Sequence, residues 1–315
     1  MRPDSFEADI AAIPQHLDDL AARLDEADPW ALLQSRSPLL TGMGSSAYAA
    51  RTAAGWLRAA GVDAVVEIAS TDPGWPGGDG ASAVLVSATG RSAETLNRAE
   101  RLLPGTQRVA LVNRVDSLLA READLVVSMS AGEEVGEVAC RTYRHSLALM
   151  LALGEDRSHL AEECRAAAAA TRELLGALAW LDPIDEVLDP GDTTYWIAPE
   201  SRIGSALQSA LMIREIPRRR AVACETGDWS HVDVYLTLTT DYRCVVFTGS
   251  RWDEQAAGWL RKRGSHVVSV GTPLDVPGEV NLPLAGGPFA RMLTETLIAE
   301  LIALRWWRKD PVEVP

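Results

Sequence analysis

Residues 81–95 read ASAVLVSATGRSAET, and this stretch decides the fold. The run from Ala83 to Ser87 lacks the polar alternation of a half-exposed strand. Such a run is typical of a parallel sheet that is covered on both faces. Hydroxyl groups and Gly90 follow at once, and a helical pattern over 93–103 then ends before a Pro-Gly pair. A buried strand that turns directly into a helix predicts an α/β fold.

The same alternation of short strands and helices extends to both sides of this stretch. Strands are predicted at 38–41, 64–68, 83–87, 108–112, 194–198, 221–225, 244–248 and 266–270. Helices are predicted at 6–24, 46–60, 93–103, 203–215, 254–263 and 288–307. A helical region over 138–178, broken near 154–158, lies between the two halves, and residues 182–192 are predicted as a linker.

The two halves repeat each other at a nearly constant offset. Gly42 lies 156 residues before Ala198, and Glu67 lies 158 residues before Glu225. The sequence therefore predicts an internal duplication: two tandem doubly wound parallel-sheet domains, each with three αβα layers. We expect an N-terminal helix over 1–30, a first domain over 31–181, and a second domain with a C-terminal helix over 182–315.

The composition excludes several classes of protein. The chain has 315 residues, of which 47% are hydrophobic, and its net charge of −14 is unfavourable for binding nucleic acid or an anionic membrane. The N-terminus is acidic and lacks an apolar segment, and no apolar run reaches the ~18 residues of a membrane span. The four cysteines have neither disulfide nor zinc-ligand spacing. We expect a cytoplasmic protein with no metal site.

Two polar turns are candidates for an anion site. The first is Gly42–Ser46 (GMGSS) and the second is Ser87–Ser92 (SATGRS), and each joins a predicted strand to a helix. Taken alone, each could also be an ordinary capped turn. The carboxyl ends of neighbouring parallel strands open at the same edge of a sheet, so the two turns together favour phosphate binding. No complete G-x-G-x-x-G motif is present, which disfavours a dinucleotide.

Three stretches carry a resemblance to a known family: GMGSSAYAA from Gly42, SATGRSAETL from Ser87 and AGEEVGEVACRTY from Ala131. They resemble the phosphosugar-binding sugar-isomerase (SIS) domain. Two tandem copies resemble the isomerase half of glucosamine-6-phosphate synthase and the amino-sugar-phosphate deaminases and isomerases. The resemblance implies that four hydroxyl side chains hold the phosphate, those of Ser46, Ser87, Thr89 and Ser92. It implies further substrate contacts from Gly44, Ser45 and Gly90.

The second half resembles the same family around ALMIREI and ETGDWSH. In the family, a glutamate on this helix moves the proton between C1 and C2, and a histidine sixteen residues later helps to open the sugar ring. Glu215 and His231 have this spacing. A carboxylate and an imidazole suit these two steps. Without the resemblance, Glu215 would be interpreted as a solvated helix-end residue and His231 as an interface residue.

The resemblance implies a phosphosugar aldose–ketose isomerase, or an amino-sugar-phosphate deaminase/isomerase, that acts through an enediol or enediolamine without a metal or organic cofactor. It also implies a homodimer, because the histidine reaches the site from the partner subunit in relatives. No stretch matches a glutaminase domain. The family's glutamine, serine and lysine fall on Ala88, Ala139 and Met212, which leaves a non-catalytic phosphosugar sensor as the alternative.

The remaining histidines lack ligand spacing and are expected in surface or core roles; they are His16, His145, His159 and His266.

Overall fold

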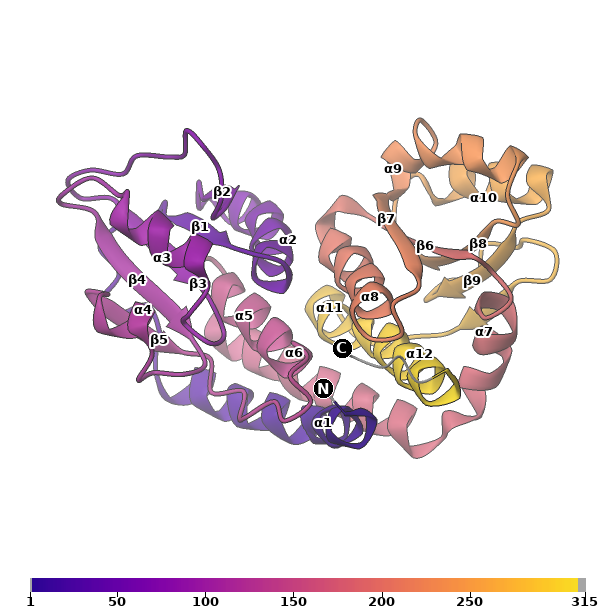
Figure 1. Cartoon of the computed structure of the whole chain (residues 1–315), viewed down its shortest axis with the longest axis horizontal. Helices are drawn as coiled ribbons and strands as arrows, with labels where there is room; N and C mark the ends of the chain where they lie inside the picture. Colours follow the sequence, from indigo (N-terminus) through magenta and orange to yellow (C-terminus); the bar gives the residue numbers. More distant parts are fainter. Residues whose placement is uncertain (1, 311–315) are drawn as a thin grey trace. The chain divides into compact units, whose positions relative to one another are not determined.

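The computed structural model describes residues 2–310, so the outer ends of the predicted domains, residue 1 and residues 311–315, lie outside the described part. The chain divides into two compact units. Of the described residues, the N-terminal unit comprises 12–165, and the C-terminal unit comprises 2–11 together with 166–310. The strands of the two units belong to two separate parallel sheets, which Figure 1 shows in magenta and in orange.

Sheet A, in the N-terminal unit, has five parallel strands in the order β2-β1-β3-β4-β5. The strands are β1 (Leu39–Gly42), β2 (Val65–Ile68), β3 (Ser82–Val86), β4 (Gln107–Val112) and β5 (Leu125–Ser128). Every residue of the central strand β3 is buried. This burial explains why the run has no polar alternation, since helices cover both faces of the sheet.

The helices of the N-terminal unit form the outer layers. They are α2 (Ser45–Ala59), α3 (Ala93–Glu100), α4 (Leu118–Arg121) and α5 (Arg141–Leu151), together with parts of α1 (Pro3–Glu26) and α6 (Arg157–Gly176). Helices α3 and α4 lie on one face of the sheet, and α2 packs against α5 on the other (Figure 1). The break predicted near 154–158 separates α5 from α6.

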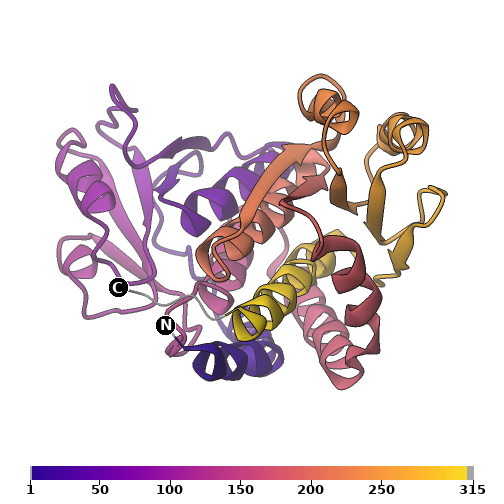
Figure 2. The same cartoon turned by 45° about the vertical axis from the view of Figure 1, so that its right-hand side comes forward.

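Sheet B, in the C-terminal unit, has five parallel strands in the order β10-β9-β8-β6-β7. The strands are β6 (Thr193–Ala198), β7 (Arg220–Glu225), β8 (Arg243–Phe247), β9 (His266–Val270) and β10 (Val280–Leu282). The helices are α7 (Leu181–Leu188), α8 (Ile203–Glu215), α9 (Thr226–Trp229), α10 (Asp253–Arg263), α11 (Pro288–Thr294) and α12 (Thr296–Lys309). Helix α12 lies alongside α8 within this unit (Figures 1 and 2).

The two sheets have the same connectivity. In each, the first strand lies between the second and third, and the fourth and fifth continue outward from the third. This is the doubly wound arrangement, in which the chain reverses direction across the sheet between the first and third strands. The predicted fold class and internal duplication are therefore confirmed. Strands β1–β5 lie within residues 31–181 and strands β6–β10 within 182–315.

One local prediction was wrong: the supposed linker over 182–192 contains most of helix α7. Leu181, Ile184 and Leu188 lie at helical spacing and are buried. The acidic residues between them bind α12 instead of facing only solvent. Asp185 Oδ1 accepts a hydrogen bond from Trp306 Nε1 at 2.6 Å. The charged residues and prolines of 182–192 suggested a linker, but most of this segment is a helix that packs against α12.

No helix within residues 2–310 is both long enough and apolar enough to cross a membrane.

A buried ion pair joins three segments at the carboxyl edge of sheet B. Arg202, which follows β6, pairs with Glu295 at the junction of α11 and α12, and it donates a hydrogen bond to the carbonyl oxygen of Thr248 after β8. Arg202 is 5% exposed and Glu295 is 1% exposed. A charge at this depth requires its partner, because desolvation without pairing is unfavourable.

We predict that Arg202→Met lowers the free energy of unfolding by about 3–5 kcal/mol, because Glu295 stays buried without its cation. The double variant Arg202→Met/Glu295→Leu should recover most of this loss. Urea denaturation measures both, with Arg165→Met as the control, since Arg165 and Asp25 form a half-exposed pair. A loss below about 1 kcal/mol for Arg202→Met, the range of surface pairs, would show that the buried pair does not support the fold.

Candidate functional site

The two polar turns singled out in the sequence lie side by side in the structure. Strands β1 and β3 are neighbours, and Gly42 at the end of β1 is opposite Val86 at the end of β3. Helix α2 follows β1 toward β2, whereas α3 follows β3 toward β4. The turns therefore flank the point where the sheet reverses its winding, which is the usual ligand position in such sheets.

The turn after β1 is shaped by two glycines. A Cβ on Gly42 would lie 2.7 Å from the Cβ of Ser46 and 2.7 Å from the carbonyl oxygen of Val86, so only glycine allows this close approach. Gly44 has a φ of +52°, which favours glycine, and precedes α2 without a side-chain cap. Ser45 and Ser46 occupy the first turn of α2 and are half-buried. The amino end of this helix is thus suited to an anion.

The turn after β3 is fixed by contacts of Gly90 and by the hydrogen bonds of Ser92. Ser87 is buried and Thr89 is exposed. Gly90 has a φ of +61°, and a Cβ there would collide with the hydroxyl of Ser117. The Ser92 hydroxyl caps α3: it accepts from the Thr95 backbone N–H at 3.3 Å and donates to Glu94 at 2.9 Å. Ser92 therefore has a structural role at the start of α3.

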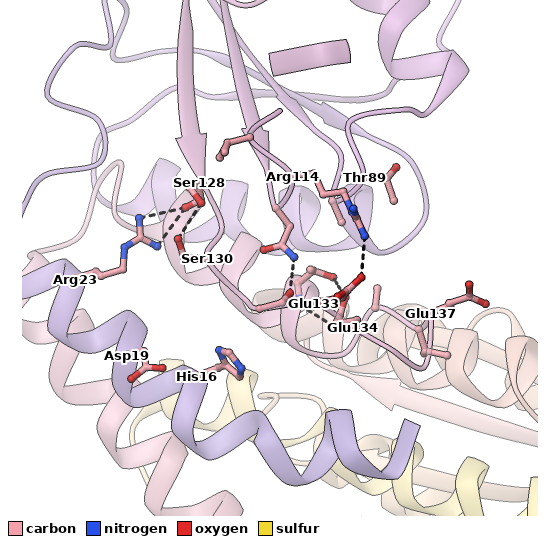
Figure 3. Close-up of a pocket in the computed structure, with 17 residues that line it drawn as sticks. His16, Asp19, Arg23, Thr89, Arg114, Ser128, Ser130, Glu133, Glu134 and Glu137 are labelled. Atoms are coloured by element: carbon pink, nitrogen blue, oxygen red, sulfur yellow. Dashed lines mark hydrogen bonds and ion pairs between the residues drawn. The ribbon is translucent and has the colours of Figure 1, made fainter. Parts of the chain in front are cut away.

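A cavity of about 960 Å³ opens at the carboxyl edge of sheet A, entirely within the N-terminal unit (Figure 3). Four segments line it: one face of α1, the turn after β3, the turn after β4, and the segment between β5 and α5. Among the lining residues are Ala88 and Thr89 of the predicted phosphate turn, with His16, Asp19 and Arg23 of α1 on the facing wall. The other predicted phosphate residues, Ser46, Ser87 and Ser92, do not line this cavity.

Charges of both signs surround the cavity. Arg114 pairs with Glu133 at 3.1 Å, and both side chains are largely exposed. Arg23 donates to the carbonyl oxygen of Ser128 at 3.4 Å, at the end of β5 (Figure 3). Such a mixed lining can hydrogen-bond the hydroxyl groups of a sugar as donor and as acceptor.

Glu134 holds the segment between β5 and α5 in place. Its Oε1 accepts hydrogen bonds from the backbone N–H groups of Cys140, Arg141 and Thr142 at 2.6–3.0 Å, and its Oε2 accepts from the Thr142 hydroxyl at 2.7 Å. Burial raises the pKa of Glu134, against the effect of these hydrogen bonds. The carboxylate serves as the amino-terminal cap of α5 and is occupied by four donors.

Glu215 and His231 lie at opposite edges of sheet B. Glu215 is the last residue of α8, which runs antiparallel to the strands and ends near the amino end of β7. His231 is exposed and follows α9, beyond the carboxyl end of β7. Six residues of extended strand separate the two edges by about 16 Å. Within one chain, the structure does not bring these two residues together.

Sequence reasoning missed the contribution of α1. The apolar positions from Phe6 to Leu24 identify the buried face of the helix, but the pattern does not show what its polar face meets. That face supplies His16, Asp19 and Arg23 to the cavity. Their spacing of three and four residues places them on one side of a helix, and this was the only signal available.

His145, in α5, is a buried neutral histidine beneath the cavity wall. It is 1% exposed, and its Nδ1 lies 2.8 Å from the carbonyl oxygen of Met129 at the end of β5. The hydrogen bond places the proton on Nδ1, and Nε2 is a buried atom without a hydrogen-bond partner. Burial lowers the pKa of His145 to about 4. Its ring makes an edge-to-face contact with the ring of His16, with the centroids 6.3 Å apart.

Comparison with curated proteins finds isomerizing glutamine–fructose-6-phosphate aminotransferases among the relatives of this chain. The chain is 28% identical over 261 residues to the isomerizing glutamine–fructose-6-phosphate aminotransferase of Zymomonas mobilis, which covers 75% of this chain and 42% of that protein. It is 27% identical over 233 residues to the corresponding protein of Halobacterium salinarum, which covers 67% of this chain and 39% of that protein. The chain thus spans less than half the length of these relatives. No family model matches it.

Comparison with solved structures finds the same fold over nearly the whole chain. The C-terminal domain of glucosamine-fructose-6-phosphate aminotransferase from Francisella tularensis has a TM-score of 0.80 at 20% identity, covering 95% of this chain and 94% of that one. Tagatose-6-phosphate ketose/aldose isomerase from Escherichia coli has a TM-score of 0.81 at 16% identity, covering 97% and 93%. Glucosamine-6-phosphate deaminase from Thermotoga maritima has a TM-score of 0.73 at 18% identity, covering 98% and 96%.

We predict that His145 destabilises the protein as the pH falls. Between pH ~6.5 and ~4 the unfolded chain binds a proton that the buried folded histidine does not, so stability is full above the unfolded pKa and is lost below it, by about 1.4 kcal/mol per pH unit. Thermal or urea unfolding at pH 7.5 and pH 5 measures this slope. His145→Asn should reduce it, whereas the exposed control His159→Asn should not. An unchanged slope in His145→Asn would contradict the assignment.

Proposed function

The chain is a double sugar-isomerase-domain protein, related in sequence to the isomerizing aminotransferases, and from this premise we propose that it binds a phosphosugar and moves a proton between C1 and C2. The proposed activity is that of an aldose–ketose isomerase or an amino-sugar-phosphate deaminase/isomerase. It proceeds through an enediol or enediolamine and needs a base and an acid but no metal or organic cofactor. The pairing of the two polar turns at the winding reversal of sheet A is the observation that carries the proposal.

The phosphate is proposed to lie against the two turns. The uncapped amino end of α2 and the hydroxyls of Ser46, Ser87 and Thr89 supply donors to an anion. Gly44 is exposed and a Cβ there would meet no protein atom within 4 Å, so a ligand can approach its backbone closely. Gly90 is buried against Ser117 and contributes by shaping the second turn. Ser92 contributes by capping α3, which fixes the second turn. The sugar would then extend into the 960 Å³ cavity beyond Thr89.

Glu215 is the proposed base, and His231 is the proposed ring-opening residue. Because the two lie at opposite edges of sheet B within one chain, we propose that His231 serves the site of a partner subunit in a homodimer. Three exposed apolar side chains follow His231 within seven residues of sequence: Val232 is 52% exposed, Tyr235 is 65% exposed and Leu238 is 57% exposed. Large exposed apolar residues of this kind favour a protein interface.

A phosphosugar sensor is the second candidate function. Ala88 stands where the family has a glutamine, and Met212 is fully buried where the family has a lysine. A buried methionine offers neither a proton nor a charge to a substrate. A sensor would retain the phosphate turns and the cavity but would catalyse no exchange with solvent.

We predict that the wild-type protein incorporates solvent deuterium at C1 or C2 of a phosphosugar, and that Glu215→Gln abolishes incorporation while ligand binding persists. The carboxylate takes the proton from carbon, whereas the amide cannot. Proton NMR in D₂O with fructose 6-phosphate, glucosamine 6-phosphate and their galacto and N-acetyl relatives, with and without ammonium, measures it. Glu254→Gln, an exposed position on α10, is the control. Binding without incorporation in the wild type would favour the sensor.

We predict that mixing inactive Glu215→Gln and His231→Gln chains restores activity. If the two residues reach one site from different subunits, random pairing places one intact site in half of the dimers, which gives about a quarter of wild-type activity. The mixture is dissociated and reassociated before the deuterium assay. Activity no higher than that of the single variants, despite confirmed mixed dimers, would place both residues in the same subunit's site or outside the reaction.

A further inference from the structure

A second pocket, of about 420 Å³, lies beside the turn after β3 within the N-terminal unit. It is lined by Arg91 of that turn and by four residues between β4 and the end of α4, namely Asp116, Ser117, Leu118 and Arg121. None of these five residues lines the 960 Å³ cavity. The pocket therefore has a lining of its own.

The pocket and the cavity are built on the same two segments. In the turn after β3, Thr89 lines the cavity and Arg91 lines the pocket. The segment after β4 is divided in the same way, since residues 113–115 line the cavity and residues 116–118 line the pocket. Thr89 is labelled at the cavity in Figure 3. The two segments thus supply one group of side chains to the cavity and another to the pocket.

Hydrogen bonds within the protein hold these two segments together. The backbone N–H of Leu119 donates to the carbonyl oxygen of Gly90 at 3.1 Å. The Ser117 hydroxyl accepts from the backbone N–H of Ala120 at 3.4 Å. The frame of the pocket is therefore fixed before any ligand arrives, which lowers the cost of ordering a site.

Two guanidinium groups of this pocket have no partner within residues 2–310. Arg91 and Arg121 are exposed, and neither side chain makes an ion pair or a hydrogen bond in that part of the chain. Arg114, in the same segment after β4, instead pairs with Glu133 at 3.1 Å. Two positive groups that border the same space repel each other, and a bound anion removes this repulsion. The pocket thus offers two free cations to a ligand.

From this geometry we propose that the pocket binds a compact dianion, a phosphate monoester or a dicarboxylate, between the guanidinium groups of Arg91 and Arg121. The planar fork of a guanidinium matches two oxygens of either group. Leu118, which is 51% exposed, and the alkyl stems of the two arginines offer apolar surface to the carbon skeleton of the ligand. Asp116 accepts a hydrogen bond from a hydroxyl group on that skeleton.

The proposal goes beyond the proposed function, because it requires neither a bound phosphosugar nor proton transfer. Isothermal titration calorimetry of the full chain at low salt measures it, with glycerol 3-phosphate and succinate as the two probes. We expect one arginine-dependent site per chain, and the probe that binds it more tightly identifies the charged group of the ligand. Raising the salt concentration should weaken this binding, because both cations are exposed.

Substitutions of the two arginines test the site directly. Arg121→Gln should raise the Kd about 10-fold, and Arg91→Gln/Arg121→Gln about 100-fold, since each removes a charge-assisted pair. Arg58→Gln, at an exposed position of α2 outside the pocket, removes the same charge and is the matched control. All three positions are exposed, so thermal unfolding should give an unchanged Tm for every variant.

A phosphate monoester could also bind at the turn after β1, and Ser46→Ala distinguishes the two sites. Ser46 does not line the pocket, so its substitution should leave the arginine-dependent binding unchanged. Amide signals in ¹H–¹⁵N NMR spectra locate the probe independently. Those of Leu118 and Arg121 should shift when the probe is added.

Three results would overturn the proposal: no binding of either probe to the wild type, binding that survives Arg91→Gln/Arg121→Gln unchanged, or binding that Ser46→Ala removes. Failure of the proposed isomerase has a different signature, the absence of deuterium incorporation. That absence would leave the titration with glycerol 3-phosphate or succinate unaffected.

Discussion

The parallel pairing of β1 with β3 is the contact on which the candidate site depends. It places the end of one strand at Gly42 directly against the other at Val86, with no space for a side chain between them. The chain leaves the two strands in opposite directions, so the turns after them diverge at this edge of the sheet. Every proposed phosphate contact lies on one of these two turns. A bulkier residue at Gly42 would push apart the two strands that bring the turns together.

The rest of the cavity is organised by polar side chains that bind backbone instead of ligand. Glu134 caps α5, and Asn113 fixes the backbone at Ala131 and Gly132. Glu134 comes from a stretch that carries the family resemblance and Asn113 follows β4, yet the hydrogen bonds of both side chains are already made within the protein. They keep the loop after β5 in one conformation, and that conformation determines where His16 can rest. The walls of the cavity are therefore held in place by a second layer of structural hydrogen bonds.

Much of the fold could be predicted from the sequence because its buried strands are continuous and its halves repeat. The family resemblance was confirmed by the comparisons, whereas the roles of the individual hydroxyls, of Glu215 and of His231 stay predictions. Strands β5 and β10 were not predicted, because they are short edge strands with half-exposed residues. Helix α7 was missed because its acidic side chains bind α12. The polar face of α1 carried too little pattern to indicate that it lines a cavity.

Arg202 makes the carboxyl edge of sheet B different from the equivalent edge of sheet A. In sheet B, the turns after β6 and β8 correspond to the turns after β1 and β3 in sheet A. There the guanidinium of Arg202 lies between them, bonded to the carbonyl oxygen of Thr248 and paired with Glu295. The guanidinium at this edge is bonded to groups of the protein itself, so the surroundings of these turns differ from those in sheet A. Under the proposed function, the two duplicated sheets are therefore not equivalent, and we expect one phosphosugar per chain, bound at sheet A.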